Sequence, residues 1–251
     1  MAGKKPSVGV AIFIVVVSAV IGIGLLVLTD EEPVPVSATK PKDTEASVLW
    51  FQDNSVLQNI SLEQDFQKDN YYIVFDGSGS MRERDKLTIA KTALSKFVTF
   101  VPPDANLGLA VFDGSGLSER VPLGTDRELF LNAVNKVRAD GNTPLDQSME
   151  LAFDKLRVQA RKQLGYGEYN IVVVTDGEAT SGYEPDSIVR KILTSSPVVI
   201  HTIGFQIGEN HSLNQPGKIL YKSANNFDEL SQGLESVLAE SENFVVTDFK
   251  K

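Results

Sequence analysis

The chain has 251 residues, of which 42% are hydrophobic and 23% charged, a composition that supports a sizeable core and excludes disorder throughout. It carries 24 Lys and Arg against 33 Asp and Glu, a formal net charge of -9, which argues against general nucleic-acid binding. With no Cys and only two His, it excludes disulfides and cysteine nucleophiles and leaves too few ligands for a typical zinc site.

The first predicted element is a membrane-spanning helix over residues 7–29, a stretch without any charged side chain. Its length exceeds the roughly 20 residues that a helix needs to cross the hydrocarbon layer. Lys4 and Lys5 precede it and acidic residues follow it, which predicts residues 1–6 in the cytosol and the remainder outside. A cleaved signal peptide is the alternative, but the apolar region of such peptides spans only about 7–15 residues.

Two segments separate this helix from the first regular strand. Residues 30–46 contain three Pro and almost no large apolar side chain, which is typical of a solvated linker. Residues 47–69 regain apolar side chains without a clear period, and we expect an N-terminal extension packed on the following domain. Trp50, the only Trp, is expected to be buried there rather than to mark a partner-binding surface.

Strands and helices are predicted to alternate from residue 70 onward. The expected strands are residues 71–75, 107–112, 119–123, 171–174, 198–203 and 219–222, and the expected helices are 87–101, 125–138, 144–156, 185–193 and 227–239. The alternation predicts an α/β domain over residues 70–241, doubly wound around an open, mostly parallel sheet with helices on both faces. Residues 242–251 would form a C-terminal tail.

Two details refine this topology. The sequence DGSG at residues 113–116 is typical of a hairpin turn between two of the strands. The run at residues 171–174 is continuously apolar, which favours a central strand covered on both faces. His201 is expected in a buried or edge strand.

Oxygen-bearing side chains gather at the ends of these predicted elements. Asp76, Ser78 and Ser80 follow the first strand, and an extended loop would point all three to one side. Thr143 lies just before a predicted helix, where it could also serve as an N-cap, and Asp176 follows residues 171–174. Because open α/β sheets bind ligands at the carboxyl ends of strands, we expect these five side chains at one sheet edge.

With these residues in place, the chain from about residue 70 to 240 resembles a von Willebrand factor type A domain of the compact bacterial type. The resemblance identifies Asp76, Ser78, Ser80, Thr143 and Asp176 as a metal-ion-dependent adhesion site. It implies that the three hydroxyls bind a divalent cation directly and the two aspartates act through water. Mg²⁺ is the expected cation, with Mn²⁺ or Ca²⁺ as alternatives. Hydroxyl ligands cancel little of its charge, so it stays attractive to the Asp or Glu carboxylate of a protein partner.

The sequence therefore favours a membrane-tethered, non-enzymatic protein-interaction module displayed outside the cytosol, most simply on a bacterial inner membrane with a periplasmic domain. A structural or assembly subunit of an envelope complex, with a cation that only braces loops, is the alternative. A hydrolase using Ser80, His211 and Asp176 is disfavoured, because His211 lies in a polar loop and neither a nucleophile elbow nor a phosphate loop is present. The oligomeric state is not specified by the sequence. Residues 205–218 are shorter and more polar than in many members of the family, which leaves the placement of the last strand open.

Overall fold

A computed structural model of the chain describes residue 50, residues 61–63 and residues 66–241. The predicted membrane helix, linker and C-terminal tail lie outside these residues, as does most of the N-terminal extension, so these expectations stay predictions. In the part of the chain that the structure describes, no helix has both the length and the apolar character needed to cross a membrane.

A six-stranded sheet with the order β3-β2-β1-β4-β5-β6 forms the centre of the domain. The strands are β1 (Asn70–Asp76), β2 (Asn106–Asp113), β3 (Gly116–Gly124), β4 (Tyr169–Thr175), β5 (Val199–Phe205) and β6 (Leu220–Ala224). Only β3 runs antiparallel, joined to β2 by the predicted hairpin turn. The predicted mostly parallel sheet is confirmed. The strand β2 pairs with one edge of β1, and β4 pairs with the other edge. The strand order therefore reverses between β1 and β4, and ligands of such sheets bind at this point.

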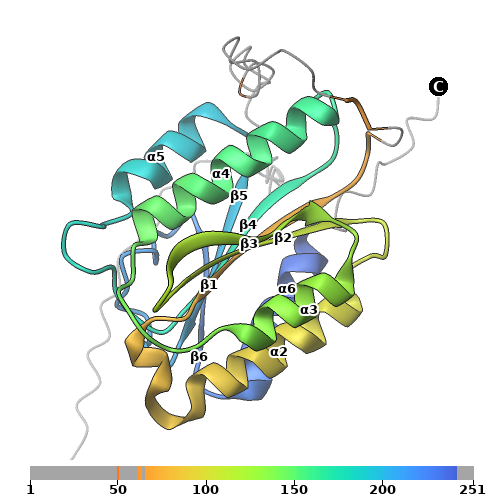
Figure 1. Ribbon diagram of the computed structural model, residues 1–251. Helices are drawn as coiled ribbons and strands as arrows, with labels where there is room; N and C mark the ends of the chain where they lie inside the picture. The colour runs from red at the N-terminus through yellow and green to blue at the C-terminus, as the bar shows by residue number, and fades with distance from the viewer. Residues whose placement is uncertain (1–49, 51–60, 64–65, 242–251) are drawn as a thin grey trace, which may run out of the picture. The chain divides into compact units, whose positions relative to one another are not determined.

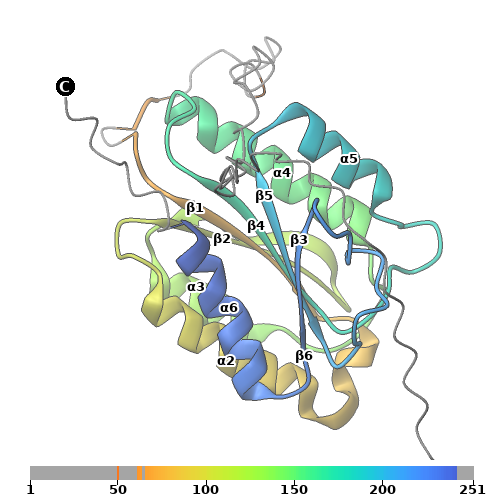
Figure 2. The ribbon, with the colours of Figure 1, turned by 180° about the vertical axis from the view of Figure 1, so that it is seen from behind.

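Helices cover both faces of the sheet, as predicted (Figure 1). The helices α2 (Lys86–Phe100), α3 (Arg127–Lys136) and α6 (Phe227–Ser241) lie on one face, and α4 (Leu145–Lys162) and α5 (Asp186–Ser195) lie on the other, as Figure 2 shows from behind. A hydrophobic core lies on each face of the sheet, and side chains of β1 alternate between the two. Ile73 and Phe75 pack with α2, α3 and α6, whereas Tyr72 and Val74 pack with α4 and α5. This period of two is the expected signature of a strand buried on both faces.

Three local expectations need correction or sharpening. The predicted extended loop after Asp76 continues only to Ser78, which has extended backbone angles, because Gly79–Asp85 forms 3-10 turns with a kink at Glu83 and Arg84. Pro144 immediately precedes α4 instead of starting it, so the helix begins at Leu145. The last strand is β6, which pairs in parallel with β5 at the sheet edge, and the chain between these two strands contains neither helix nor strand.

The described parts of the N-terminal extension contact α4. The Trp50 ring is buried, stacked on Phe153 with centroids 6.0 Å apart and edge-on to Tyr169 at 5.1 Å. The Nε of Arg157 donates a hydrogen bond to the Trp50 carbonyl oxygen at 3.1 Å. Such aromatic pairs contribute about 0.5–1.5 kcal/mol beyond the burial of their area, which holds this part of the extension to the domain.

His201, in β5, makes the stability of the fold pH-dependent. Its side chain is buried, with Nε2 3.2 Å from Oδ1 of Asn170, and burial lowers its pKa to about 4. The unfolded chain has the ordinary His pKa of about 6.5. Between pH 6.5 and about 4, His201 therefore binds a proton in the unfolded state but not in the folded state. This contribution to stability is complete above pH 6.5 and is lost progressively as the pH falls toward 4.

We therefore expect the free energy of unfolding of the wild type to fall relative to that of His201→Gln by about 2 kcal/mol between pH 7 and pH 5. Urea denaturation of the full chain in detergent, with chelator, measures this difference, and the other titrating groups cancel between the two proteins. Parallel pH dependences of wild type and variant would contradict the assignment.

Candidate metal centre

Asp76 lies at the carboxyl end of β1 and is completely buried. Its Oδ1 accepts a hydrogen bond from the backbone N–H of Ser78 at 2.7 Å, and its Oδ2 accepts one from Oγ1 of Thr175 at 2.6 Å. A Cβ at the next residue, Gly77, would come within 2.7 Å of Cγ1 of Val137, so only glycine fits this tight exit from the strand. The carboxylate is thus fixed in orientation beneath the loop that follows it.

The two serines meet through the 3-10 helix that begins at Gly79. Their Oγ atoms lie 3.0 Å apart, and Oγ of Ser80 donates a hydrogen bond to Oδ1 of Asp176 at 2.6 Å. Ser78 is buried, whereas Ser80 is exposed, so the cluster opens to solvent at Ser80. Four of the five predicted residues, Asp76, Ser78, Ser80 and Asp176, are therefore joined in one hydrogen-bonded group.

Thr143 is buried, and its backbone is hydrogen-bonded to Thr180 in the loop that follows β4. Its backbone N–H donates to Oγ1 of Thr180 at 3.0 Å, and its carbonyl oxygen accepts from the backbone N–H of Thr180 at 3.1 Å. Among the described residues, no hydrogen bond links its side chain to the other four predicted residues. The N-cap position of α4 is taken by Pro144 without a side-chain cap, so the Thr143 hydroxyl does not cap the helix as the alternative interpretation expected.

Lys86 is a member of this cluster that the sequence analysis missed. It is the first residue of α2, it is buried, and its Nζ lies 2.7 Å from Oδ2 of Asp176. The two oxygens of Asp176 are thus divided between Ser80 and Lys86. No sequence pattern could have pointed to this pair, because 90 positions separate its members.

The cluster holds more negative charge than its single ammonium group cancels. Burial, together with the nearby Asp176 carboxylate, raises the pKa of Asp76 to about 6, against the lowering effect of the hydrogen bonds from Ser78 and Thr175. With Lys86 as its only adjacent cation among the described contacts, the pair of carboxylates favours an additional positive charge.

The donor set fits a hard divalent cation. All available ligands are oxygens, and the 3.0 Å separation of the two serine Oγ atoms matches the spacing of about 2.9 Å between adjacent oxygens of an octahedral Mg²⁺ shell. Within the described part of the chain, no group of three or more His, Cys, Asp or Glu side chains could hold a metal. Any cation here would therefore depend on hydroxyl ligands and retained water as well as on the two aspartates.

His211 supports the loop after β4 rather than acting on Ser80. Its Nδ1 accepts a hydrogen bond from the backbone N–H of Leu213 at 2.9 Å, so its Nε2 carries the proton and donates to the carbonyl oxygen of Gly177 at 2.9 Å. The arrangement of Ser80, His211 and Asp176 is therefore not that of a hydrolytic triad.

Comparisons with known proteins agree with this fold. The family model described as the von Willebrand factor type A domain matches residues 70–250. The chain is 29% identical over 194 residues to YwmD of Bacillus subtilis, which is described as uncharacterized, with 66% of this chain and 83% of that protein covered.

Solved structures show the same architecture at low identity. A von Willebrand factor type A structure from Catenulispora acidiphila matches with a TM-score of 0.56 and 17% identity, covering 70% of this chain and 43% of that chain. The pilus adhesin SpaC from Lactobacillus rhamnosus GG matches at 0.54 and 14%, covering 72% and 31%. An aerotolerance-related membrane protein from Bacteroides fragilis matches at 0.53 and 19%, covering 70% and 100%. The chain spans less than half of the first two of these solved chains.

Proposed function

Because the chain belongs to the von Willebrand factor type A domain family, we propose that it is a membrane-tethered interaction module that binds a protein partner in a divalent-cation-dependent way. The observation that carries the proposal is the pair of hydroxyls of Ser78 and Ser80, 3.0 Å apart where the strand order reverses, with the Ser80 hydroxyl donating to Asp176. Domains of this family are generally interaction modules rather than enzymes.

The residues proposed to hold the cation are the five that the sequence singles out. Ser78, Ser80 and Thr143 would bind it directly, and Asp76 and Asp176 would act through water. The bound cation would offer an incompletely neutralised coordination position to a partner's Asp or Glu carboxylate. Mg²⁺ is the proposed cation because the oxygen spacing suits its small octahedral shell.

The proposed setting is a membrane. Residues 7–29 would anchor the chain, with Lys4 and Lys5 keeping the N-terminus in the cytosol and the domain displayed outside, for example in a bacterial periplasm. Two of the similar solved proteins are described in related terms, one as a pilus adhesin and one as a membrane protein.

Thr143→Ala tests the proposal with little disturbance of the fold, because the hydroxyl has no hydrogen-bond partner among the described residues. A cation at a hundredfold excess over its Kd stabilises the folded state by about 2.7 kcal/mol. Losing one direct ligand is expected to weaken Mg²⁺ binding at least tenfold and to remove about 1.4 kcal/mol of that stabilisation. Thermal melts of the full chain in detergent, with Mg²⁺ and with chelator, measure the shift.

Thr88→Ala is the matched control, since it makes the same change at an exposed position of α2. The control should keep the wild-type Mg²⁺ shift, and both variants should melt like the wild type in chelator. A wild-type protein without any Mg²⁺ shift, or a Thr143→Ala protein with a full one, would contradict the proposed function. A cation that stabilises the fold while carboxylate probes bind equally well in chelator would instead support the structural-subunit alternative.

A further inference from the structure

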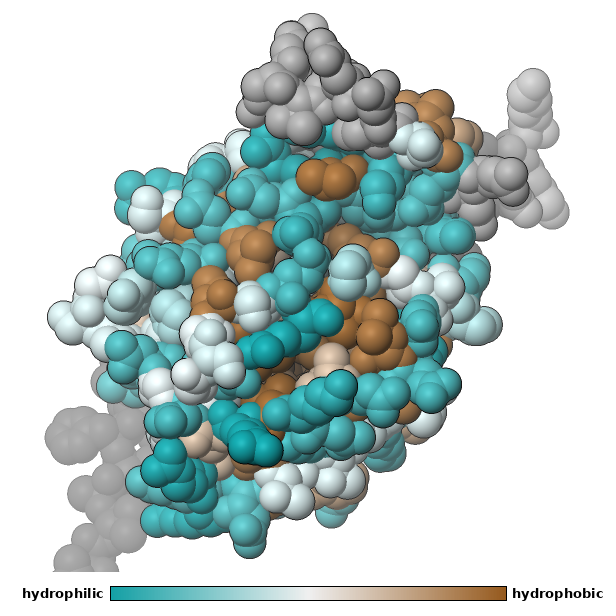
Figure 3. Space-filling view, in the orientation of Figure 1, coloured by the Kyte–Doolittle hydropathy of each residue, from teal (hydrophilic) through white to brown (hydrophobic). Residues whose placement is uncertain are grey.

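An open pocket of about 820 Å³ lies beside the candidate metal centre and is lined by several basic side chains. Four basic side chains, Lys91, Arg120, Lys136 and Arg138, line it together with only two carboxylates, Asp113 and Asp140. This local excess of positive charge is unexpected in a chain with a formal net charge of -9. The face shown in Figure 3 is mainly hydrophilic, with hydrophobic residues interspersed among polar ones.

The pocket and the metal centre share a wall. Val137, Arg138 and Asp140 line the pocket, and the same stretch of chain continues within a few residues to Thr143. The backbone N–H of Asp140 donates to the carbonyl oxygen of Gly77 at 2.8 Å, between Asp76 and Ser78 of the metal centre. A ligand on the centre would therefore have this pocket as its immediate neighbour.

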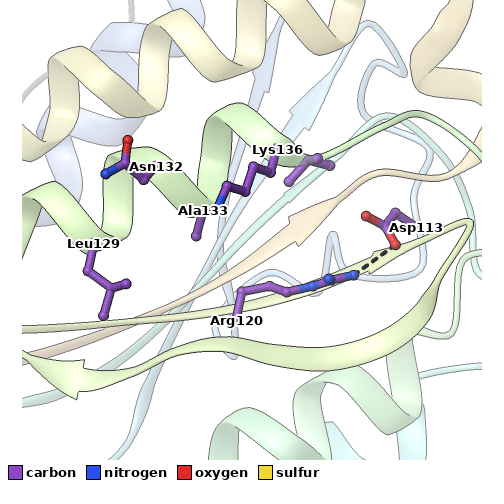
Figure 4. Close-up of a pocket in the computed structure, with 7 residues that line it drawn as sticks. Asp113, Arg120, Leu129, Asn132, Ala133 and Lys136 are labelled. Atoms are coloured by element: carbon purple, nitrogen blue, oxygen red, sulfur yellow. Dashed lines mark hydrogen bonds and ion pairs between the residues drawn. The ribbon is translucent and has the colours of Figure 1, made fainter.

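Much of the positive charge in the pocket is not neutralised. Asp113 is buried, and its Oδ1 accepts from Nη2 of Arg120 at 2.9 Å, as Figure 4 shows, but the buried Nε of Arg120 has no partner in the described part of the chain. Lys136 and Arg138 are exposed and form no ion pair among the described residues. The Nζ of Lys91 donates to the carbonyl oxygens of Asn135 and Val137 at 2.9 and 2.6 Å, which fixes the backbone that carries Lys136 and Arg138.

We propose that this basic pocket binds further carboxylates of the same partner, so that the partner presents an acidic segment rather than a single acidic residue. One Asp or Glu would reach the metal centre, and acidic residues close to it in the partner's sequence would lie against Arg120, Lys136 and Arg138. This inference rests on the proposed function, because it places the pocket next to a carboxylate bound at the centre. The pocket then determines which carboxylate-bearing proteins are preferred.

Two capped peptides of equal length test the inference on the full chain in detergent. One carries a single Asp among Ser and Gly residues, and the other carries the same Asp followed by several Glu. In Mg²⁺ at low salt, fluorescence anisotropy is expected to show about tenfold tighter binding of the Glu-rich peptide, an advantage that high salt removes.

The double variant Lys136→Glu/Arg138→Glu should bind the Glu-rich peptide no better than the single-Asp peptide, while its affinity for the single-Asp peptide and its Mg²⁺ shift remain. The control Arg190→Glu/Lys191→Glu makes the same change of net charge on α5, on the other face of the sheet, and should keep the preference.

The possible outcomes distinguish the role of the basic pocket from the proposed cation-dependent binding. Equal Mg²⁺-dependent binding of both peptides would support the proposed function and overturn the role of the pocket. A preference for the Glu-rich peptide that persists in chelator would support the pocket and contradict cation-dependent binding. Binding of neither peptide, or equal loss of preference in the α5 control, would overturn the inference.

Discussion

Asp76→Asn is expected to abolish the Mg²⁺ response of the protein and at the same time to stabilise its metal-free form at neutral pH. Burial raises the pKa of Asp76 to about 6, compared with 3.8 for an unperturbed Asp. The folded state therefore favours the protonated carboxyl. This contribution to stability is complete below pH 3.8 and is lost as the pH rises through 6, which leaves an ionised, buried carboxylate at pH 7.

An amide at this position removes that charge and can keep both of the hydrogen bonds that the carboxylate makes. The amide oxygen of the substituted side chain can still accept from the Ser78 N–H, and the amide nitrogen can donate to Oγ1 of Thr175. The Thr175 hydroxyl already lies 3.1 Å from the carbonyl oxygen of Gly177 and can donate there instead. We expect the metal-free variant to be more stable than the wild type by about 1–3 kcal/mol at pH 7.

The same change removes the carboxylate that the proposed cation needs. Without it, the Mg²⁺ stabilisation of about 2.7 kcal/mol at a hundredfold excess over Kd should disappear. Urea denaturation of the full chain in detergent at pH 7, with Mg²⁺ and with chelator, measures both effects. A variant that is less stable in chelator and still gains stability from Mg²⁺ would show that Asp76 has only a structural role.

Lys86→Met is expected to have the opposite effect on the metal-free protein. Met keeps much of the length and apolar bulk of the Lys side chain but leaves the buried carboxylate of Asp176 without its ion-pair partner at 2.7 Å. Removing one member of a buried pair costs about 3–5 kcal/mol, so the metal-free variant should be strongly destabilised. Mg²⁺ should then stabilise the variant more than it stabilises the wild type, because the cation supplies the missing positive charge.

A double-mutant cycle isolates this interaction. Lys86→Met together with Asp176→Asn removes both charges, so the double variant should recover most of the stability lost in chelator while gaining nothing from Mg²⁺. Chemical denaturation of the four proteins gives the coupling energy. If Lys86→Met is as stable as the wild type in chelator, or if its Mg²⁺ shift is smaller, the ammonium group does not compensate Asp176 in the metal-free state.

The order and type of most elements could be predicted from the sequence, because the signals involved are local. The continuous apolar run at residues 171–174 identified β4 as a central strand, and the DGSG turn identified the β2–β3 hairpin. Placing Asp76 and Asp176 after two parallel strands was enough to expect them at one sheet edge, since the carboxyl ends of parallel strands meet there.

The arrangement of the oxygens and charges of the site could not be predicted from the sequence, because it depends on contacts between distant segments. The sequence indicated an extended loop after Asp76. In the structure, the backbone N–H of Gly79 donates to the carbonyl oxygen of Gly141, and the 3-10 turn that begins at Gly79 brings the two serine hydroxyls together. The pairing of Lys86 with Asp176, and the basic pocket between the β2–β3 turn and the end of α3, join segments far apart in the chain. Such contacts depend on how helices pack on the sheet, and neither periodicity nor turn chemistry encodes that packing. The burial that raises the pKa of Asp76 has the same origin, because desolvation depends on the surrounding fold rather than on neighbouring residues in the sequence.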